Sequence, residues 1–296
     1  MDATSNRIER ALRAGARGVL LQTHEEDRAL QALEAVAERL GWSAHTWSSA
    51  RGADQAAPQP LAGRIFFIDT PGATQSTVLR LQPGPPRGAA DYFPTTLMAA
   101  VLGGGFSSRL NMNLREDKGY AYGARGRVDY PLPPYGVVSA SAQVQADATY
   151  QALLEIEHEL GGLATGAAPV TAEELGREQT GAILALPGRF ATAEAALAQY
   201  RELVRFGLPL DYYARYAARI GAVTAAEVAR AAARHLRPRD GVYIVVGDGN
   251  AKMIVHDPAA AKDAPVARRR PPLTRGGAQL TLRDALADLA AQGTLG

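Results

Sequence analysis

The sequence predicts an α+β fold in which helices pack on one face of an antiparallel sheet. Runs typical of strands, apolar or alternating, occur at 64–69, 75–82, 120–129, 137–145 and 241–247. Segments with helical periodicity lie between them, at 91–101, at 148–163 and through most of the stretch from 164 to 240. Strands and helices in this order suit such a sheet, preceded here by a small βαβ-like N-terminal segment.

Length and composition describe a folded protein. The chain has 296 residues, enough for one large domain or two ordinary ones with a sizeable core. Its hydrophobic content of 47% and charged content of 21% are those of a globular protein rather than a disordered one. A net charge of +2 gives no reason to expect nucleic acid or a membrane as partner. The absence of cysteine excludes disulfides, thiolate zinc sites and a cysteine nucleophile.

No targeting or spanning segment is recognised in the sequence. The first fifteen residues hold no continuous apolar stretch of the kind found in a secretory signal. No apolar run approaches the ~20 residues that a spanning helix needs. We therefore expect a cytoplasmic chain as given, and a periplasmic one if the true N-terminus is missing.

We divide the chain into three parts. Residues 1–56 form a small βα segment and linker, with a strand at 19–22 and a helix at 25–40. Residues 57–256 form the main α+β domain, and residues 257–296 a flexible linker followed by a terminal helix. The first part loosely resembles the N-terminal region of AAA-type ATPases. Because the chain contains no G-x-x-x-x-G-K-[ST] loop, no ATPase activity follows.

Helix starts are predicted from capping residues. Thr171 with Glu174, and Thr224 with Glu227, have the spacing of capping boxes. We expect Asp147 to cap the helix at 148–163. Ser107 and Ser108 are expected to cap a short helix at 109–116.

The stretch 102–123, LGGGFSSRLNMNLREDKGYAYG, is the candidate functional region. It opens with three consecutive glycines, Gly103, Gly104 and Gly105. These glycines are explained either as the end of a helix or as backbone that approaches a ligand closely. Gly119 ends the short helix and a strand begins, so Arg115 and Tyr122 flank a helix-to-strand turn. The pair could aim a cation and a phenol at one point, or could be an ordinary exposed arginine and a packed aromatic.

No other chemistry is recognised in the chain. Zinc peptidases need two histidines and a carboxylate, as in H-E-x-x-H or H-x-x-E-H, and neither pattern occurs. Glu155 and His158 form one E-x-x-H pair, but a carboxylate-bridged di-iron site needs a second copy. The serine-hydrolase motif G-x-S-x-G is also missing. We expect no metal and no cofactor bound by this chain.

Four segments together resemble the C-terminal domain of pitrilysin/insulinase-type zinc peptidases, the inverzincins. They are QSTVLRLQPGPPR, the candidate stretch, LPGRF and VTAAEVARAAARHLRPRDGVYIVVGD, in the same order and spacing, between about 63 and 255. In that family two halves, each built from two related α+β domains, close around a peptide. One half carries zinc on an H-x-x-E-H helix, and the other supplies R-x-x-x-G-x-x-Y, which here falls on Arg115, Gly119 and Tyr122.

The resemblance implies roles for these residues. Arg115 and Tyr122 would hold the substrate backbone and stabilise the developing oxyanion, and the glycine-rich segment would line the chamber. Zinc would sit on a partner subunit with H-x-x-E-H, so the chain would form a heterodimer and be inactive alone. The domain that precedes this one in the family is replaced by a segment of about fifty residues, which suggests a fusion or a truncated chain.

Two alternatives stay open. The chain could be a catalytically inactive interaction or scaffold protein with the same fold, although the intact R-x-x-x-G-x-x-Y pattern weighs mildly against this. Residues 1–56 could be an adaptor that docks the domain elsewhere. In each case we expect an oligomer, because the sheet face that meets the other domain in the family would expose apolar surface.

Overall fold

The computed structural model describes residues 65–132, 135–257 and 270–291. The chain divides into two units, Met1–Gln59 and Pro60–Gly296, and every described residue belongs to the second. The expectations for residues 1–56, including their strand and helix, lie outside the described residues. Of the helices that the structure describes, none combines the length and the apolar character needed to cross a membrane.

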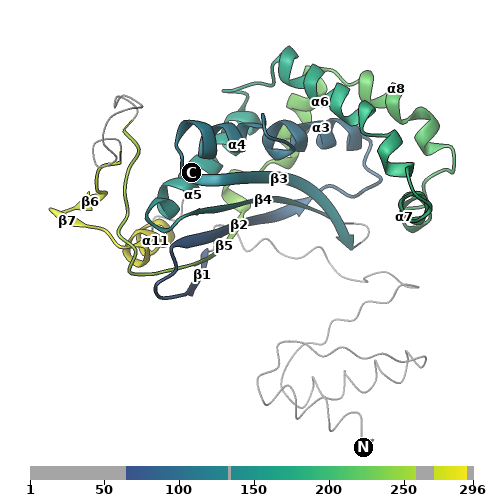
Figure 1. The fold of residues 1–296 in the computed structure, drawn as a ribbon. Coiled ribbons are helices and arrows are strands. Elements are labelled where there is room, and N and C mark those ends of the chain that lie inside the picture. The colour runs from purple at the N-terminus through teal and green to yellow at the C-terminus, as the bar shows by residue number, and fades with distance from the viewer. Residues whose placement is uncertain (1–64, 133–134, 258–269, 292–296) are drawn as a thin grey trace, which may run out of the picture. The chain divides into compact units, whose positions relative to one another are not determined.

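Five strands of the described part form one sheet in the order β1-β5-β2-β4-β3 (Figure 1). Their bounds are Ile65–Asp69 for β1, Gln75–Gly84 for β2, Ala121–Leu132 for β3, Tyr135–Gln145 for β4 and Val242–Gly247 for β5. All neighbouring strands pair antiparallel except β1 and β5, which run parallel. The predicted α+β class is confirmed, with this one parallel pair added.

Alternation along the strands explains which face the helices cover. In β2 the residues Ser76, Val78 and Arg80 are buried, whereas their neighbours Thr77 and Leu79 are more exposed. β4 and β5 show the same period of two. Since successive strand residues point to opposite faces, one face meets the helices and the other does not.

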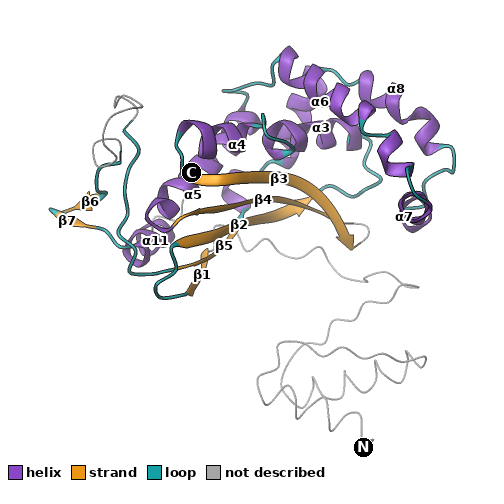
Figure 2. Ribbon diagram, viewed as in Figure 1, coloured by secondary structure: helices purple, strands orange, loops and turns teal. Residues whose placement is uncertain are grey.

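The helices come from the middle and the end of the chain. Their bounds are Tyr92–Gly103 for α3, Arg109–Asn111 for α4, Thr149–Thr165 for α5, Ala172–Leu184 for α6, Ala193–Arg205 for α7, Tyr216–Gly221 for α8, Ala225–His235 for α9 and Leu282–Ala291 for α11. Figure 2 shows α3, α4, α5 and α6 on one side of the sheet. The predicted inward residues are buried: Leu97, Met98 and Val101 in α3, and Leu153, Ile156 and Leu160 in α5.

Both predicted capping boxes are confirmed, at the starts of α6 and α9. The predicted caps at Asp147, Ser107 and Ser108 are wrong. Asp147 lies in a 3₁₀ turn before α5, and Thr149 at the start of the helix donates its hydroxyl to Ala146 O at 2.8 Å. Ser108 occupies the cap position of α4, but its side chain accepts no N–H of the helix, and its hydroxyl donates to Gly105 O at 2.6 Å. Local hydrogen bonds of Ser and Thr hydroxyl groups to nearby backbone carbonyls are an alternative to capping.

Residues 270–279, assigned to a linker in the sequence analysis, form a short hairpin of β6 (Thr274–Arg275) and β7 (Ala278–Gln279). Leu273 N donates to Met253 O at 2.9 Å, which fixes the hairpin to the segment after β5. The predicted terminal helix is present as α11, with Leu282, Leu286 and Leu289 buried. The residues 258–269 of the predicted linker lie outside the described residues, and the three-part division stays a prediction.

A buried ion pair crosses the core beneath the sheet. Arg80 of β2 is fully buried and its Nε lies 2.6 Å from Glu157 Oε1 of α5. Tyr243 of β5 donates its hydroxyl to the same carboxylate oxygen at 2.8 Å. Burial raises the pKa of the Glu157 carboxyl, and Arg80 opposes that rise. Removing one partner of such a pair is costly because it leaves a buried charge uncompensated.

Candidate functional site

The candidate site begins where α3 ends against β3. Gly103 is the last residue of α3, and a Cβ built on it would come within 1.8 Å of Gly126 N. Only glycine allows the helix end to approach the strand this closely. At Gly105 a Cβ would meet nothing within 4 Å. The first glycine of the run therefore has a packing reason, while the third is free of one.

Asn111 connects the glycine loop with β3. It is the last residue of α4 and is buried. Its side-chain amide donates to Phe106 O at 2.7 Å, and its Oδ1 accepts the N–H of Ala124 at 3.1 Å. One side chain thus satisfies a carbonyl of the loop and an N–H of the strand, which fixes the position of both.

Two irregularities of the backbone place the predicted pair. Residues Met112–Asp117 form a π-helix, and Arg115 lies on it. Such wide turns are rare and occur often at functional sites. Beyond Gly119, whose φ is +62°, the register of β3 against β4 shifts between Ala121 and Gly123. Tyr122 is the extra residue of this bulge and is 84% exposed.

Arg115 and Tyr122 are brought together by this geometry. The guanidinium carbon of Arg115 lies 4.8 Å from the ring centroid of Tyr122 and 4.8 Å from that of Phe106. Arg115 Nε is also 3.1 Å from Glu116 Oε1. A guanidinium over two aromatic faces is a favourable arrangement that restrains the arginine.

The pair opens into a cavity of ≈ 580 Å³. Three segments line it: the glycine loop with α4 and the π-helix, the start of β3, and neighbouring positions of β2 and β4. The lining residues are Thr77, Gly103, Gly104, Gly105, Phe106, Asn111, Arg115, Tyr122, Gly123, Ala124, Arg125, Ser141, Ala142 and Gln143. Of the predicted site residues, Gly119 is the one outside this lining, and it forms the turn that connects the π-helix to β3.

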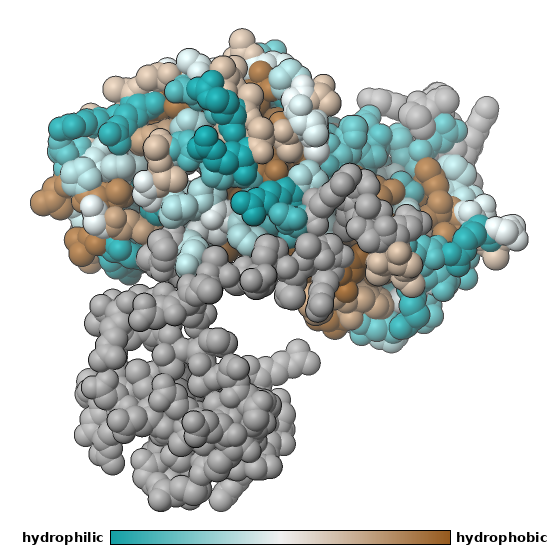
Figure 3. All heavy atoms as spheres, turned by 180° about the vertical axis from the view of Figure 1, so that it is seen from behind, coloured by the Kyte–Doolittle hydropathy of each residue, from teal (hydrophilic) through white to brown (hydrophobic). Residues whose placement is uncertain are grey.

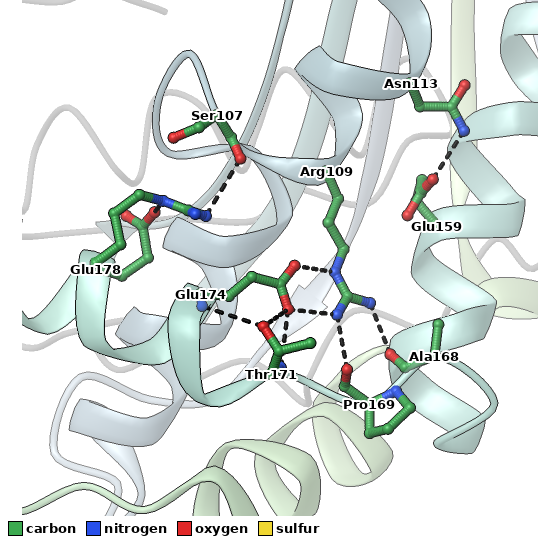
Figure 4. A network of polar contacts seen from close by, with 10 residues as sticks. Ser107, Arg109, Asn113, Glu159, Ala168, Pro169, Thr171, Glu174 and Glu178 are labelled. Carbon is green, nitrogen blue, oxygen red and sulfur yellow. Dashed lines mark hydrogen bonds and ion pairs between the residues drawn. The ribbon is translucent and has the colours of Figure 1, made fainter. Parts of the chain in front are cut away.

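A charged network fastens α4 to the rest of the domain (Figure 4). Arg109 pairs with Glu174 through two bonds, Nε to Oε1 at 2.7 Å and Nη2 to Oε2 at 2.8 Å. Its guanidinium also donates to Ala168 O at 2.6 Å and to Pro169 O at 2.9 Å. Because Glu174 belongs to the capping box of α6 with Thr171, the start of α6 and the start of α4 are held by one carboxylate.

Further bonds hold the loop and the π-helix from either side. Arg177 of α6 donates to Ser107 O at 3.2 Å. Asn113 of the π-helix donates to Glu155 Oε2 at 2.9 Å and to Glu159 Oε1 at 2.8 Å, both on α5. The segment that carries Arg115 is therefore positioned by α5 and α6, which keeps the candidate site on rigid elements.

Tyr120, the other tyrosine of the stretch 102–123, has a different role. Tyr120 is buried, and its hydroxyl accepts the N–H of His256 at 3.0 Å. Burial raises the pKa of Tyr120 to about 12, so its phenol stays neutral. It supports the turn from inside, and Tyr122 is the tyrosine that lines the cavity.

The residues that the structure describes include no group of three or more His, Cys, Asp or Glu side chains that could hold a metal ion. Glu155 of the E-x-x-H pair is instead bonded to Asn113 and lies 3.9 Å from Lys118 Nζ. What the site offers chemically is a set of hydrogen-bond donors, a guanidinium and a phenol, at one cavity.

Asn111, Phe106 and Arg125 are among the lining residues that the sequence does not predict. Asn111 is a polar residue between two buried leucines, Leu110 and Leu114, and a polar side chain at a buried position signals a hydrogen-bonding task. Phe106 and Arg125 give no comparable signal, since an exposed aromatic after glycines or an arginine on a strand is common. Only the fold brings them to the cavity.

Comparison with known families gives one match. A family model described as "Peptidase M16 inactive domain" matches residues 23–181, more than half of the chain. No curated protein matches. The loose resemblance of residues 1–56 to AAA-type ATPases finds no support, and the family match itself starts inside that segment.

Several solved structures share the fold. The peptidase M16 inactive domain from Pseudomonas fluorescens is 22% identical with a TM-score of 0.57, over 75% of this chain and 51% of that one. A protease from Helicobacter pylori is 16% identical with a TM-score of 0.58, over 75% and 52%. An inactive peptidase domain from Bordetella parapertussis is 24% identical with a TM-score of 0.52, over 60% and 92%. The chain thus spans about half the length of the first two, and likeness at this identity shows the fold alone.

Proposed function

The chain belongs to the family of peptidase M16 inactive domains, and from this premise we propose that it supplies the metal-free half of a peptidase active site. The membership confirms the resemblance to pitrilysin/insulinase-type peptidases found in the sequence.

The observation that carries the proposal is the pairing of Arg115 with Tyr122 at one open cavity. A guanidinium has only donors, and a phenol can donate as well. Both can bind a peptide carbonyl, and both gain strength when negative charge develops on its oxygen. The π-helix and the bulge hold the two groups in place before a substrate arrives, so little reorganisation is needed.

The zinc that the family uses does not fit this chain. The sequence contains no H-x-x-E-H helix, and the described residues offer no alternative set of ligands. We therefore assign the metal and the general base to a separate zinc-bearing subunit, which would form a heterodimer with this chain. In that assembly Arg115 and Tyr122 hold and orient the peptide.

The test is peptide cleavage by this chain co-purified with a zinc-bearing subunit of the family. Arg115→Ala should lower kcat by ~10²–10³, the usual loss when one oxyanion donor is removed. Tyr122→Phe removes only the hydroxyl, and because that hydroxyl is the second donor, kcat should also fall. Arg127→Ala, on the same strand but outside the cavity lining, is the control and should cleave as the parent does.

The alternative, an inactive scaffold with the same fold, gives a different result. A scaffold would assemble with its partner, while Arg115→Ala and Tyr122→Phe would leave cleavage unchanged. Parent-like rates in both variants would therefore overturn the assignment of these two residues, whatever the stability of the complex.

A further inference from the structure

The cavity at the candidate site is lined by a second positive charge, that of Arg125, which has no role in the proposed function. Its lining contains two guanidinium groups, those of Arg115 and Arg125, and no carboxylate. A cavity lined by one sign of charge raises the local concentration of ligands of the opposite sign. The electrostatics of the cavity thus favour a substrate that brings a negative charge.

The two arginines differ in what already surrounds them. Arg115 lies between two aromatic rings and 3.1 Å from a carboxylate oxygen of Glu116. Arg125 is exposed, and no ion pair or hydrogen bond of its side chain occurs among the described residues. An exposed guanidinium at the cavity wall, with no counter-ion in the described part of the chain, is available to a ligand.

The position of Arg125 sets where that ligand charge would be. It lies three residues beyond Tyr122 along β3, opposite Ser141 of β4, which also lines the cavity. Three residues of strand span roughly 10 Å. An extended peptide whose carbonyl is held by Arg115 and Tyr122 would reach Arg125 with a group two or three residues away.

We propose that Arg125 is a specificity-determining residue that selects peptides with a carboxylate two or three residues from the cleaved bond. The inference rests on the proposed function and names the substrate class of the same site. Arginine is suited to this because its planar fork binds a carboxylate through two parallel hydrogen bonds. The carboxylate can come from an internal Asp or Glu side chain or from the C-terminus of a short peptide.

Arg127 provides a matched control. It follows Arg125 by two residues and therefore points to the same face of β3. It lies outside the cavity lining, and its Nε is 3.8 Å from Asp129 Oδ2. Both residues are exposed arginines of β3. A change to Glu at either position therefore alters the net charge by the same amount.

The experiment compares peptides that differ at one position, cleaved by the chain assembled with its zinc-bearing partner. Peptides with Glu, Gln or Lys there are used with amidated C-termini, and a Gln peptide with a free C-terminus separates the two carboxylate sources. The parent should favour Glu over Gln by about tenfold in kcat/KM, as expected for a hydrogen bond between charged groups. Arg125→Gln should abolish this preference, Arg125→Glu should favour Lys, and Arg127→Glu should keep the parent ratio.

A ratio that is the same in the parent and in Arg125→Gln would overturn the inference. If Arg115→Ala still slows every peptide, the proposed function survives that outcome. Conversely, if Arg115→Ala and Tyr122→Phe are fully active, the proposed function fails whatever the ratio. Binding of fluorescein-labelled Glu and Gln peptides to the full chain, followed by anisotropy, repeats the comparison without cleavage, and equal affinities would again contradict the selection.

Discussion

Arg109 and Glu174 lie outside the cavity, yet they fix the helix from which the site is built. Arg109 reaches two backbone carbonyls and both oxygens of Glu174. The hydrogen bond from Arg109 is the main reason that the pKa of Glu174 falls to about 2, and Thr171 adds to the effect. A carboxyl with a lowered pKa in the folded state stabilises the fold at every pH where it stays ionised.

The pH dependence of unfolding follows from this pair. Since the folded pKa of Glu174 lies below its ordinary value of 4.5, its contribution is present above pH 4.5 and is lost as pH falls toward about 2. In Glu174→Gln this loss is absent, so stability should change less between pH 6 and pH 2 than in the parent. Urea unfolding followed by circular dichroism measures it. Glu173→Gln, an exposed neighbour, serves as control, and equal pH profiles for parent and Glu174→Gln would contradict the prediction.

At the scale of elements, the contact between the end of α3 and β3 decides where the glycine loop begins. Leu102 packs against Gly126 from the helix side, and the backbones of Gly103 and Gly126 touch. The helix end therefore has no room for a side chain, while the loop two residues later is open. The three glycines look alike in sequence but carry different constraints.

Gly103→Ala and Gly105→Ala test this difference. A methyl group at Gly103 would overlap Gly126 N, so the helix end must shift, and we expect a loss of about 1–3 kcal/mol or more in unfolding free energy. At Gly105 there is space and φ is not positive, so the same change should be close to neutral. Thermal unfolding of the two variants gives the comparison. Equal melting temperatures would show that the close approach has no energetic weight.

Much of the element pattern could be predicted, and the exceptions have physical reasons. Strands β2 and β4, the inward face of α3 and the boxes at Thr171 and Thr224 depend on local periodicity and spacing, which the sequence displays. The bulge at Tyr122 and the π-helix depend on which backbone lies opposite, and no local pattern marks that. The buried pair of Arg80 and Glu157 could not be predicted either. A charged residue on an alternating strand does not indicate which buried residue of another element it will pair with.

For the site, the resemblance to pitrilysin/insulinase-type peptidases predicts the Arg115 and Tyr122 pair, whereas the spacing of the two residues alone does not. The structure adds the residues that shape the cavity, Asn111, Phe106 and Arg125, whose positions depend on the path of the loop. The residues next to these three in the sequence are compatible with many other local structures, so they do not predict the cavity.

At the scale of the whole molecule, exposed apolar surface is the prominent feature. Figure 3 shows hydrophobic side chains gathered at the end occupied by α7 and around β1. On α7, Leu197, Tyr200 and Val204 are exposed at helical spacing, and on β1, Phe66 and Ile68 are exposed. Contiguous apolar surface on a folded protein commonly marks a place where another protein binds.

We therefore expect the purified chain to associate at micromolar concentration, as the sequence analysis predicted. Light scattering coupled to size-exclusion chromatography measures the mass directly. The double change Leu197→Glu and Val204→Glu should shift the mass toward the monomer, while Thr180→Glu, at an exposed position of α6, should not. A monomer at every concentration of the parent would contradict the expectation.

Arg115 lies on the π-helix, and Tyr122 is the residue that the bulge adds to β3. The site therefore depends on the number of residues in the segment from Arg115 to Tyr122 as well as on which residues they are. A single deletion or insertion here would turn Tyr122 toward the other face of the sheet or rotate Arg115 away from it. In a lineage of such chains, the positions between Arg115 and Tyr122 should accept exchanges of side chains more readily than the stretch accepts a change of length.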